Sequence, residues 1–161
     1  MDQVSDISLF TDHIPALPEG VIPASREGIL AMQDALTQVT TLGRHEELFP
    51  LTHWFGDGIY TRQIFLPAGT IIIGEIHKHA HVNILIQGRC SVLTEDGVAE
   101  LVAPLTFLSK PGTKRVVFTH EDAIWTTIHR TDRTDPEMAV AELTCKDFAE
   151  YDALLQLGNK S

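Results

Sequence analysis

The sequence predicts a mainly β protein with a single domain, in which a β-barrel is preceded by one helix and followed by others. A chain of 161 residues supports one hydrophobic core and would divide into two marginal ones. Between residues 51 and 129, short segments rich in Ile, Val, Thr and Phe alternate with turn residues, which is typical of an antiparallel barrel or sandwich. Helical periodicity is confined to the two ends of the chain.

Residues 1–50 are expected to form an arm and an amphipathic helix that pack on the barrel. Prolines and a glycine interrupt residues 1–24, which therefore show neither a helical nor a strand period. Ser25 has the position of an N-cap, apolar residues follow it at helical spacing, and Gly43 ends the run. We expect one helix between these two residues.

The barrel is expected to occupy residues 51–131. Within it, the sequence Glu95-Asp96-Gly97 suits a tight hairpin turn, because glycine adopts a positive φ without strain. The predicted strands are Gly58 to Phe65, Thr70 to Gly74, Ile76 to Gln87, Cys90 to Thr94, Val98 to Val102, Thr106 to Ser109, Lys114 to Thr119 and Ala123 to His129.

Residues 132–161 are expected to be helical. Asp135 is a cap-forming residue directly before Pro136, and proline is favoured at the first position of a helix. A second capping arrangement lies between Thr144 and Asp147, and the helix that it opens is expected to end at Gly158.

Composition and charge exclude several classes of function. A net charge of −10 disfavours a large nucleic-acid interface, because such interfaces depend on clustered Lys and Arg. No apolar run is long enough to span a membrane, and the N-terminus shows no secretory signal, so we expect a cytoplasmic protein. Cys90 and Cys145 are too few and too far apart for a disulfide framework or a paired-cysteine metal site.

Three histidines at alternate positions are the most informative feature. His77, His79, His81, Asn83, Leu85 and Gln87 share one face of the predicted strand, and mostly apolar residues share the other. This polar row either lines the barrel interior or is the wet side of a half-buried strand. Same-face neighbours lie roughly 6.5 Å apart in a strand, so His79 is expected to pair with His77 or His81 on one metal ion. His77 and His81, roughly 13 Å apart, are expected not to meet unless the strand bulges.

The order of these motifs resembles that of the cupins. PAGT at 67–70, HKH at 77–79, Asn83, Gly88, PGTKR at 111–115 and WTTIH at 125–129 follow the two cupin motifs over about half of the chain. The resemblance implies a jelly-roll barrel. It also implies that His77 and His79 are paired metal ligands, although Asn83 stands where a Glu is expected and Arg115 where the last His is expected.

Two ligand replacements weaken the metal site that this resemblance implies, because a guanidinium cannot coordinate a metal. A third ligand must come from another strand, and His53, His120 and His129 are the candidates. The metal site that we expect is His77, His79 and His129, with Fe, Mn, Zn or Ni as the metal.

The sequence also resembles small uncharacterised cupin-like proteins of bacteriophage and bacterial genomes, through its HK and HxN stretches, PGTKR and WTTIH. If phage-encoded, the protein is expected in the host cytoplasm. Combined with the strand pattern, this resemblance indicates a pocket for a small anion with a planar group, with charge-assisted bonds from Lys and Arg and stacking from Trp. The expected ligand-binding residues are His77, His81, Asn83, Gln87, Lys114, Arg115, Trp125 and His129.

Three hypotheses of function follow. The first is a non-catalytic or weakly catalytic barrel that binds a small anion. The second is a metal-dependent oxygenase or isomerase, and the third is a structural or assembly protein of a phage particle. If the histidine row lines the barrel interior, the opposite face of the strand needs a cover as well. Its apolar residues Ile76, Val82, Ile84 and Ile86 are therefore expected to pack in a homodimer or higher homo-oligomer.

Overall fold

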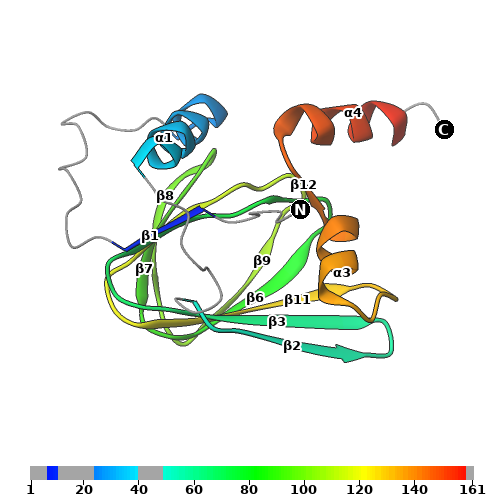
Figure 1. The fold of residues 1–161 in the computed structure, drawn as a ribbon, viewed down its shortest axis with the longest axis horizontal. Coiled ribbons are helices and arrows are strands. Elements are labelled where there is room, and N and C mark those ends of the chain that lie inside the picture. The colour runs from blue at the N-terminus through cyan, green and yellow to red at the C-terminus, as the bar shows by residue number, and fades with distance from the viewer. Residues whose placement is uncertain (1–6, 11–23, 40–48, 159–161) are drawn as a thin grey trace.

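The computed structural model describes residues 7–10, 24–39 and 49–158 and shows two five-stranded antiparallel sheets with helices along one side and at one end (Figure 1). Sheet I has the strand order β1-β4-β10-β7-β8 and sheet II the order β2-β3-β11-β6-β9. The strands are β1 (Ile7–Phe10), β2 (Leu51–Gly56), β3 (Ile59–Leu66), β4 (Thr70–Ile73), β5 (Ile76–His77), β6 (His81–Gln87), β7 (Arg89–Thr94), β8 (Gly97–Val102), β9 (Leu105–Ser109), β10 (Val116–Thr119), β11 (Ala123–Arg130) and β12 (Thr144–Cys145). The helices are α1 (Arg26–Val39), α3 (Pro136–Leu143) and α4 (Phe148–Gly158).

The main core lies between the two sheets, because each strand turns alternate apolar side chains inward. Leu85 and Trp125 from sheet II pack there against Val92 and Val117 from sheet I. The outer face of sheet I is also apolar, and α1 covers it: Ile29 of α1 belongs to one cluster with residues of β4 and β10. The described part of the chain thus confirms the predicted mainly β architecture.

Both expected helical ends are present, with the predicted caps. The side chain of Ser25 accepts a hydrogen bond from the backbone N–H of Gly28 at the start of α1. Asp135 does the same for Met138 of α3, and Pro136 occupies the first turn. Asp147 accepts from Glu150 N–H at the start of α4, and the Glu150 carboxylate accepts from the N–H of Lys146, the residue before this cap. Gly43 lies outside the described residues.

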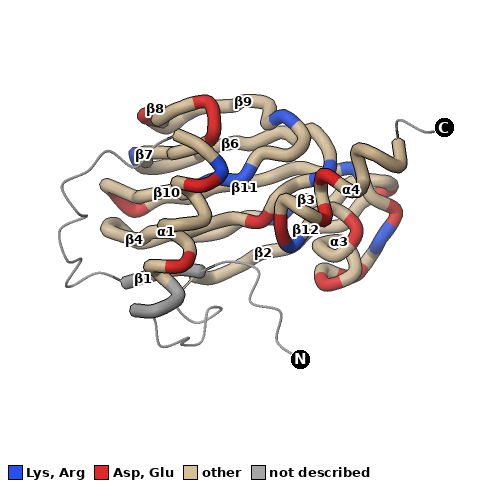
Figure 2. Tube along the Cα trace, turned by 90° about the horizontal axis from the view of Figure 1, so that it is seen from above, with Lys and Arg blue, Asp and Glu red and all other residues tan. Residues whose placement is uncertain are grey.

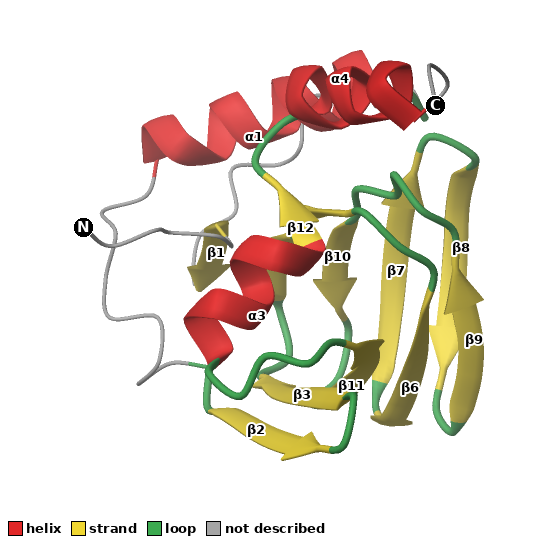
Figure 3. Cartoon of the chain, turned by 90° about the vertical axis from the view of Figure 1, so that its right-hand side faces the viewer, coloured by secondary structure: helices red, strands yellow, loops and turns green. Residues whose placement is uncertain are grey.

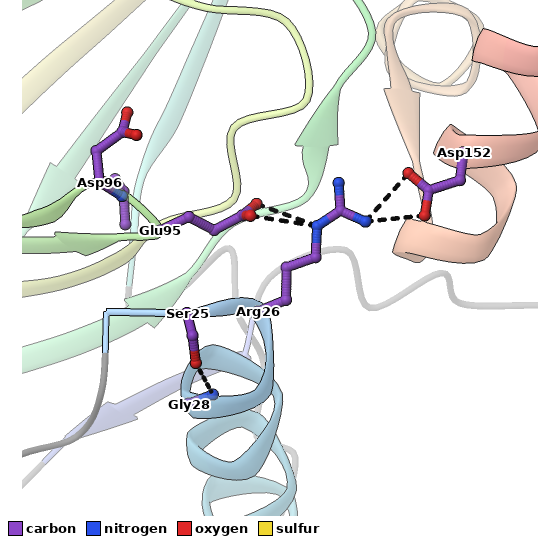
Figure 4. Close-up of polar contacts among 7 residues, drawn as sticks. Ser25, Arg26, Gly28, Glu95, Asp96 and Asp152 are labelled. Carbon is purple, nitrogen blue, oxygen red and sulfur yellow. Dashed lines mark hydrogen bonds and ion pairs between the residues drawn. The ribbon is translucent and has the colours of Figure 1, made fainter.

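Arg26 joins α1 to two other elements (Figure 4). Its Nη1 lies 2.8 Å from Oδ2 of Asp152 in α4, and its Nε lies 3.3 Å from Oε2 of Glu95 in the β7–β8 turn. Its guanidinium also lies 4.2 Å from the ring centroid of Phe148. This one side chain therefore ties the N-terminal helix to the C-terminal helix.

Three strands were not predicted. β1 lies in the arm and joins sheet I beside β4. β2 pairs with β3 across a hairpin, and Gly58 at its turn has φ 74°, a conformation that the pair Asp57-Gly58 favours. β12 pairs with β5 rather than with either large sheet. None of the described helices is long and apolar enough to cross a membrane.

Candidate metal and ligand site

Three histidine rings meet inside the barrel, and they are His77, His81 and His129. The coordinating nitrogens that they offer lie within 4.8 Å of one another. The ring centroids of His77 and His81 are 4.1 Å apart, and that of His129 lies 4.6 Å from His81 and 5.2 Å from His77. Among the described residues, this is the cluster whose geometry suits a metal ion.

His77 and His81 were expected not to meet unless the strand bulges, and they meet because the predicted continuous strand is interrupted. The predicted strand from Ile76 to Gln87 is divided into β5 and β6, and residues 78–80 form a bend between them. β5 pairs with β12, whereas β6 pairs with β9 and β11. The bend brings the His77 ring onto His81 and leaves the side chain of His79 exposed, so the structure does not bring His79 into the cluster.

The imidazole of His81 is oriented by the backbone. Its Nδ1 lies 3.2 Å from the carbonyl oxygen of His79, and an N–H donated there leaves Nε2 with its lone pair. Nε2 is buried and has no hydrogen-bond partner among the described residues. An unpartnered buried nitrogen beside two further imidazoles fits a transition metal, whose histidine ligands are commonly fixed through their other nitrogen.

Burial holds all three imidazoles in the neutral form that a metal requires. Desolvation lowers the pKa of His81 to about 4, and the nearby positive charge of Arg115 adds to the effect. Desolvation, with repulsion from His81, lowers the pKa of His129 to about 3. The pKa of His77 is also well below its ordinary value, again mainly because the ring is buried.

Asn83 and Arg115 form a polar group next to the histidines. The amide oxygen of Asn83 accepts from Trp125 Nε1 at 3.1 Å and from Arg115 Nη1 at 3.4 Å. Its amide nitrogen donates to Ser109 Oγ at 2.8 Å and to the His81 carbonyl at 3.3 Å. Arg115 donates to Ser109 as well. Asn83 is thus engaged in positioning Arg115 and Trp125, and its oxygen is not free for a metal.

A cavity of about 120 Å³ adjoins this group, and His77, Arg115, Trp125 and His129 line it. α3 and β12 contribute Val140, Leu143 and Thr144 to its wall. Figure 3 shows α3 lying across one end of the barrel beside β12. The expected C-terminal helical segment is therefore also part of the site, which no local motif of the sequence indicates.

The remaining expected site residues lie elsewhere. Gln87 is exposed, and its amide donates to the backbone of Asp122. Lys114 is buried, and its ammonium donates to the Gly74 carbonyl at 2.9 Å. His53 lies 2.9 Å from the hydroxyl of Tyr60 through Nδ1, and His120 contacts Ser91 on sheet I. Of the eight expected ligand-binding residues, the structure places His77, Arg115, Trp125 and His129 on the cavity, with His81 and Asn83 directly behind them.

Sequence reasoning missed Ser109 and the wall formed by α3. Ser109 has a detectable signal, because it pairs with His81 across β9 and β6 and so shares its face.

Comparison with known proteins gives structural matches alone. No protein-family model matches the chain, and no curated protein matches it. An acetylacetone dioxygenase from Acinetobacter johnsonii matches with a TM-score of 0.44 and 16% identity over 55% of this chain and 66% of that one. A Cupin_2 domain of an XRE family transcriptional regulator from Enterobacter cloacae matches with a TM-score of 0.45 and 10% identity, over 53% and 99%.

An RmlC-like cupin from Shewanella frigidimarina matches with a TM-score of 0.48 and 16% identity over 61% of this chain and 89% of that one. These matches have TM-scores below 0.5 and identities of 16% or less. The matched region spans slightly less than two thirds of the dioxygenase. What the two-sheet antiparallel barrel of this chain binds must therefore be argued from its own residues.

Proposed function

We propose that the protein binds one divalent transition metal through His77, His81 and His129 and holds a small anionic ligand in the adjoining cavity. The observation that supports metal binding is the buried Nε2 of His81, which has no hydrogen-bond partner among the described residues and lies beside two neutral imidazoles. A tetrahedral site with metal–nitrogen bonds of about 2.0–2.1 Å needs nitrogens roughly 3.4 Å apart. Small side-chain rotations close the observed cluster to that size. Imidazole ligands suit Zn, Fe and Ni.

The positive charge around the cavity favours an anionic ligand. The three imidazoles are neutral, and the charged residues on the cavity wall are Arg62, Glu75 and Arg115, so a divalent metal would leave a net positive charge there. Burial lowers the pKa of Arg115 to about 10, so the side chain stays protonated at neutral pH. An anionic ligand in the cavity offsets this charge, whereas a second cation or a neutral apolar molecule does not.

A metal-dependent enzyme, an oxygenase or an isomerase, is the second candidate. The observation that favours it is the number of ligands, because three protein ligands leave a coordination position open, as in catalytic zinc sites. A bound metal supplies Lewis-acid chemistry at that position. The protein's own residues bring the ligand to Arg115 and enclose it between the barrel and α3.

Metal binding is tested with the variant His81→Ala and the matched control His79→Ala. We expect protein purified without chelator, or titrated with Co²⁺, to bind about one metal per chain. His81→Ala removes a ligand and should weaken binding at least about 100-fold. His79→Ala changes an exposed histidine two residues away and should bind as the wild type does.

The readouts are elemental analysis and the visible spectrum of bound Co²⁺. Equal loss of metal in both variants, or full retention in His81→Ala, contradicts the proposed site.

A further inference from the structure

Most of the cavity wall is apolar, and its charged residues are Arg62, Glu75 and Arg115. The barrel interior and α3 both contribute aliphatic side chains to it. These are Ile64, Leu66, Ile72, Val117, Val140 and Leu143. A compact inorganic oxyanion would leave this surface without apolar contacts, although it would satisfy Arg115. The wall therefore favours a ligand with one charged end and one apolar end.

Arg115 presents its charge without an acidic partner among the described residues. The contacts found for its guanidinium are Asn83, Ser109 and the rings of Phe107 and Trp125, with ring centroids 5.9 and 5.8 Å away. A guanidinium carries five N–H donors, and these two polar partners leave donors for a ligand. Planar carboxylates match the guanidinium in geometry and form charge-assisted pairs with it.

The size of the cavity limits the ligand. A cavity of about 120 Å³ is somewhat smaller than the roughly 150 Å³ apolar cavity that accommodates benzene. A ligand of about five or six non-hydrogen atoms therefore fits. Leu143 forms part of the wall that sets this size limit. Its backbone is fixed beside the strand of His77, because its carbonyl accepts a hydrogen bond from Lys78 N–H at 2.8 Å.

We propose that the ligand is a short-chain monocarboxylate, held at its carboxylate by Arg115 and limited in length by Leu143 of α3. This inference rests on the proposed function, since it names the anion of the same site. Leu143 is accordingly a specificity-determining residue contributed by the C-terminal segment.

The test is a titration of the Co²⁺-loaded full chain with the straight-chain acids from acetate to octanoate, followed by calorimetry and the Co²⁺ spectrum. We expect the tightest binding for propanoate or butanoate. Each methylene beyond the length that fits should weaken binding about tenfold or more. Butanamide, which has the size of butanoate without its charge, should not bind, and inorganic phosphate should bind more weakly than butanoate.

Four variants separate the roles of the residues. Leu143→Ala enlarges the cavity and should move the preference to a longer acid, whereas Leu154→Ala, an exposed leucine of α4, should leave it unchanged. Arg115→Met should weaken carboxylate binding about 10- to 100-fold and retain Co²⁺. Arg115→Lys keeps the charge and should bind carboxylates with intermediate affinity. This result would show that the loss in Arg115→Met comes from the missing charge and not from a folding defect.

The outcomes distinguish this inference from the proposed function. Co²⁺ binding without a carboxylate response, tighter binding of phosphate, or no change of preference in Leu143→Ala overturns the inference and leaves the metal site standing. Absence of Co²⁺ binding overturns the proposed function. In that case, thermal-shift measurements on the metal-free protein test whether the pocket at Arg115 binds carboxylates without a metal. The absence of a shift with butanoate would overturn the inference as well.

Discussion

Asn83 shows how one side chain organises the interior of the barrel. It is fully buried, and both hydrogens and both lone pairs of its amide have partners, in Ser109, His81, Trp125 and Arg115. Because a buried polar group without a partner is costly, each of these bonds depends on the others being made. Asn83, which stands where the resemblance expects a Glu ligand, instead supports the side chains of Arg115 and Trp125.

We therefore expect Asn83→Ala to lower the free energy of unfolding by about 2–5 kcal/mol, because it leaves Trp125 Nε1 and Arg115 Nη1 without an acceptor. The measurement is urea denaturation followed by fluorescence. Gln87→Ala is the control, since Gln87 is exposed and was expected in the same site; it should change stability by less than about 0.5 kcal/mol. Similar losses in the two variants would refute the structural role of Asn83.

At the residue scale, the sequence predicts what alternation within one strand determines. His81, Asn83 and Leu85 all point inward because β6 is continuous through them. The position of His77 was not predictable in this way. Its strand ends at the bend, where backbone contacts with residue 143 hold Lys78, and local patterning carries no information about a partner so distant in the chain.

At the scale of elements, Arg26 is the link whose removal has a measurable cost. Its two ion pairs are partly solvated and are worth about 0.2–1 kcal/mol each, and its contact with the Phe148 ring adds about 0.5–1 kcal/mol. The sum indicates a modest contribution to the stability of the contact between α1 and α4.

We expect Arg26→Ala to destabilise the protein by about 1–2 kcal/mol and to increase hydrogen exchange in α4. The effect should shrink at high salt, because screening already weakens the pairs in the wild type. Lys110→Ala is the matched control, because its pair with Asp96 is 3.9 Å long and highly exposed, and should have no measurable effect. Exchange in α4 unchanged by Arg26→Ala would show that the link does not hold the helix.

Strand prediction succeeded for most segments bounded by turn residues and missed β1, β2 and β12, of which β1 and β12 lie outside the predicted barrel segment. β2 was missed although Asp57-Gly58, a favoured hairpin turn, directly follows it. β12 consists of two residues, and only its pairing with β5 makes it a strand. A segment that short has no period of its own to detect.

At the scale of the whole molecule, the two sheets differ in how their outer faces are covered. α1 covers sheet I, whereas none of the described helices lies on the outer face of sheet II (Figure 1). Cross-strand pairing places an apolar row along that face. The row contains Leu108, Val82, Ile128 and Trp54, with Ile84, Ile86 and Ile124 beside it.

A second copy of the chain is the occupant that fits this face. Its outward positions on the described strands carry no acidic residue, although the chain has a net charge of −10. Acidic residues lie around α3 and α4 and also near β8, β10 and α1 (Figure 2). Two copies therefore approach each other with least repulsion through sheet II. Five strands with three outward residues each offer roughly 500 Å² per copy, near the lower limit for a stable dimer.

We therefore expect a homodimer of the 17.8 kDa chain, built by packing sheet II against sheet II, that Leu108→Glu converts to a monomer. The control is Val98→Glu, because Val98 of β8 is 68% exposed and Leu108 is 67% exposed, but Val98 lies in sheet I. Light scattering after size exclusion gives the masses. A monomeric wild type, or equal behaviour of the two variants, would rule out this interface.

The wall that α3 and β12 contribute to the cavity has a consequence for biosynthesis. Translation proceeds from the N-terminus at about 5–20 residues per second, so every strand of the two sheets is made before Val140 and Leu143 leave the ribosome. All three histidines have been made once residue 129 has emerged, but the pairing partner of the His77 strand is β12, which follows α3. The C-terminal segment therefore fixes the place of His77 and closes the cavity in the same late step of synthesis.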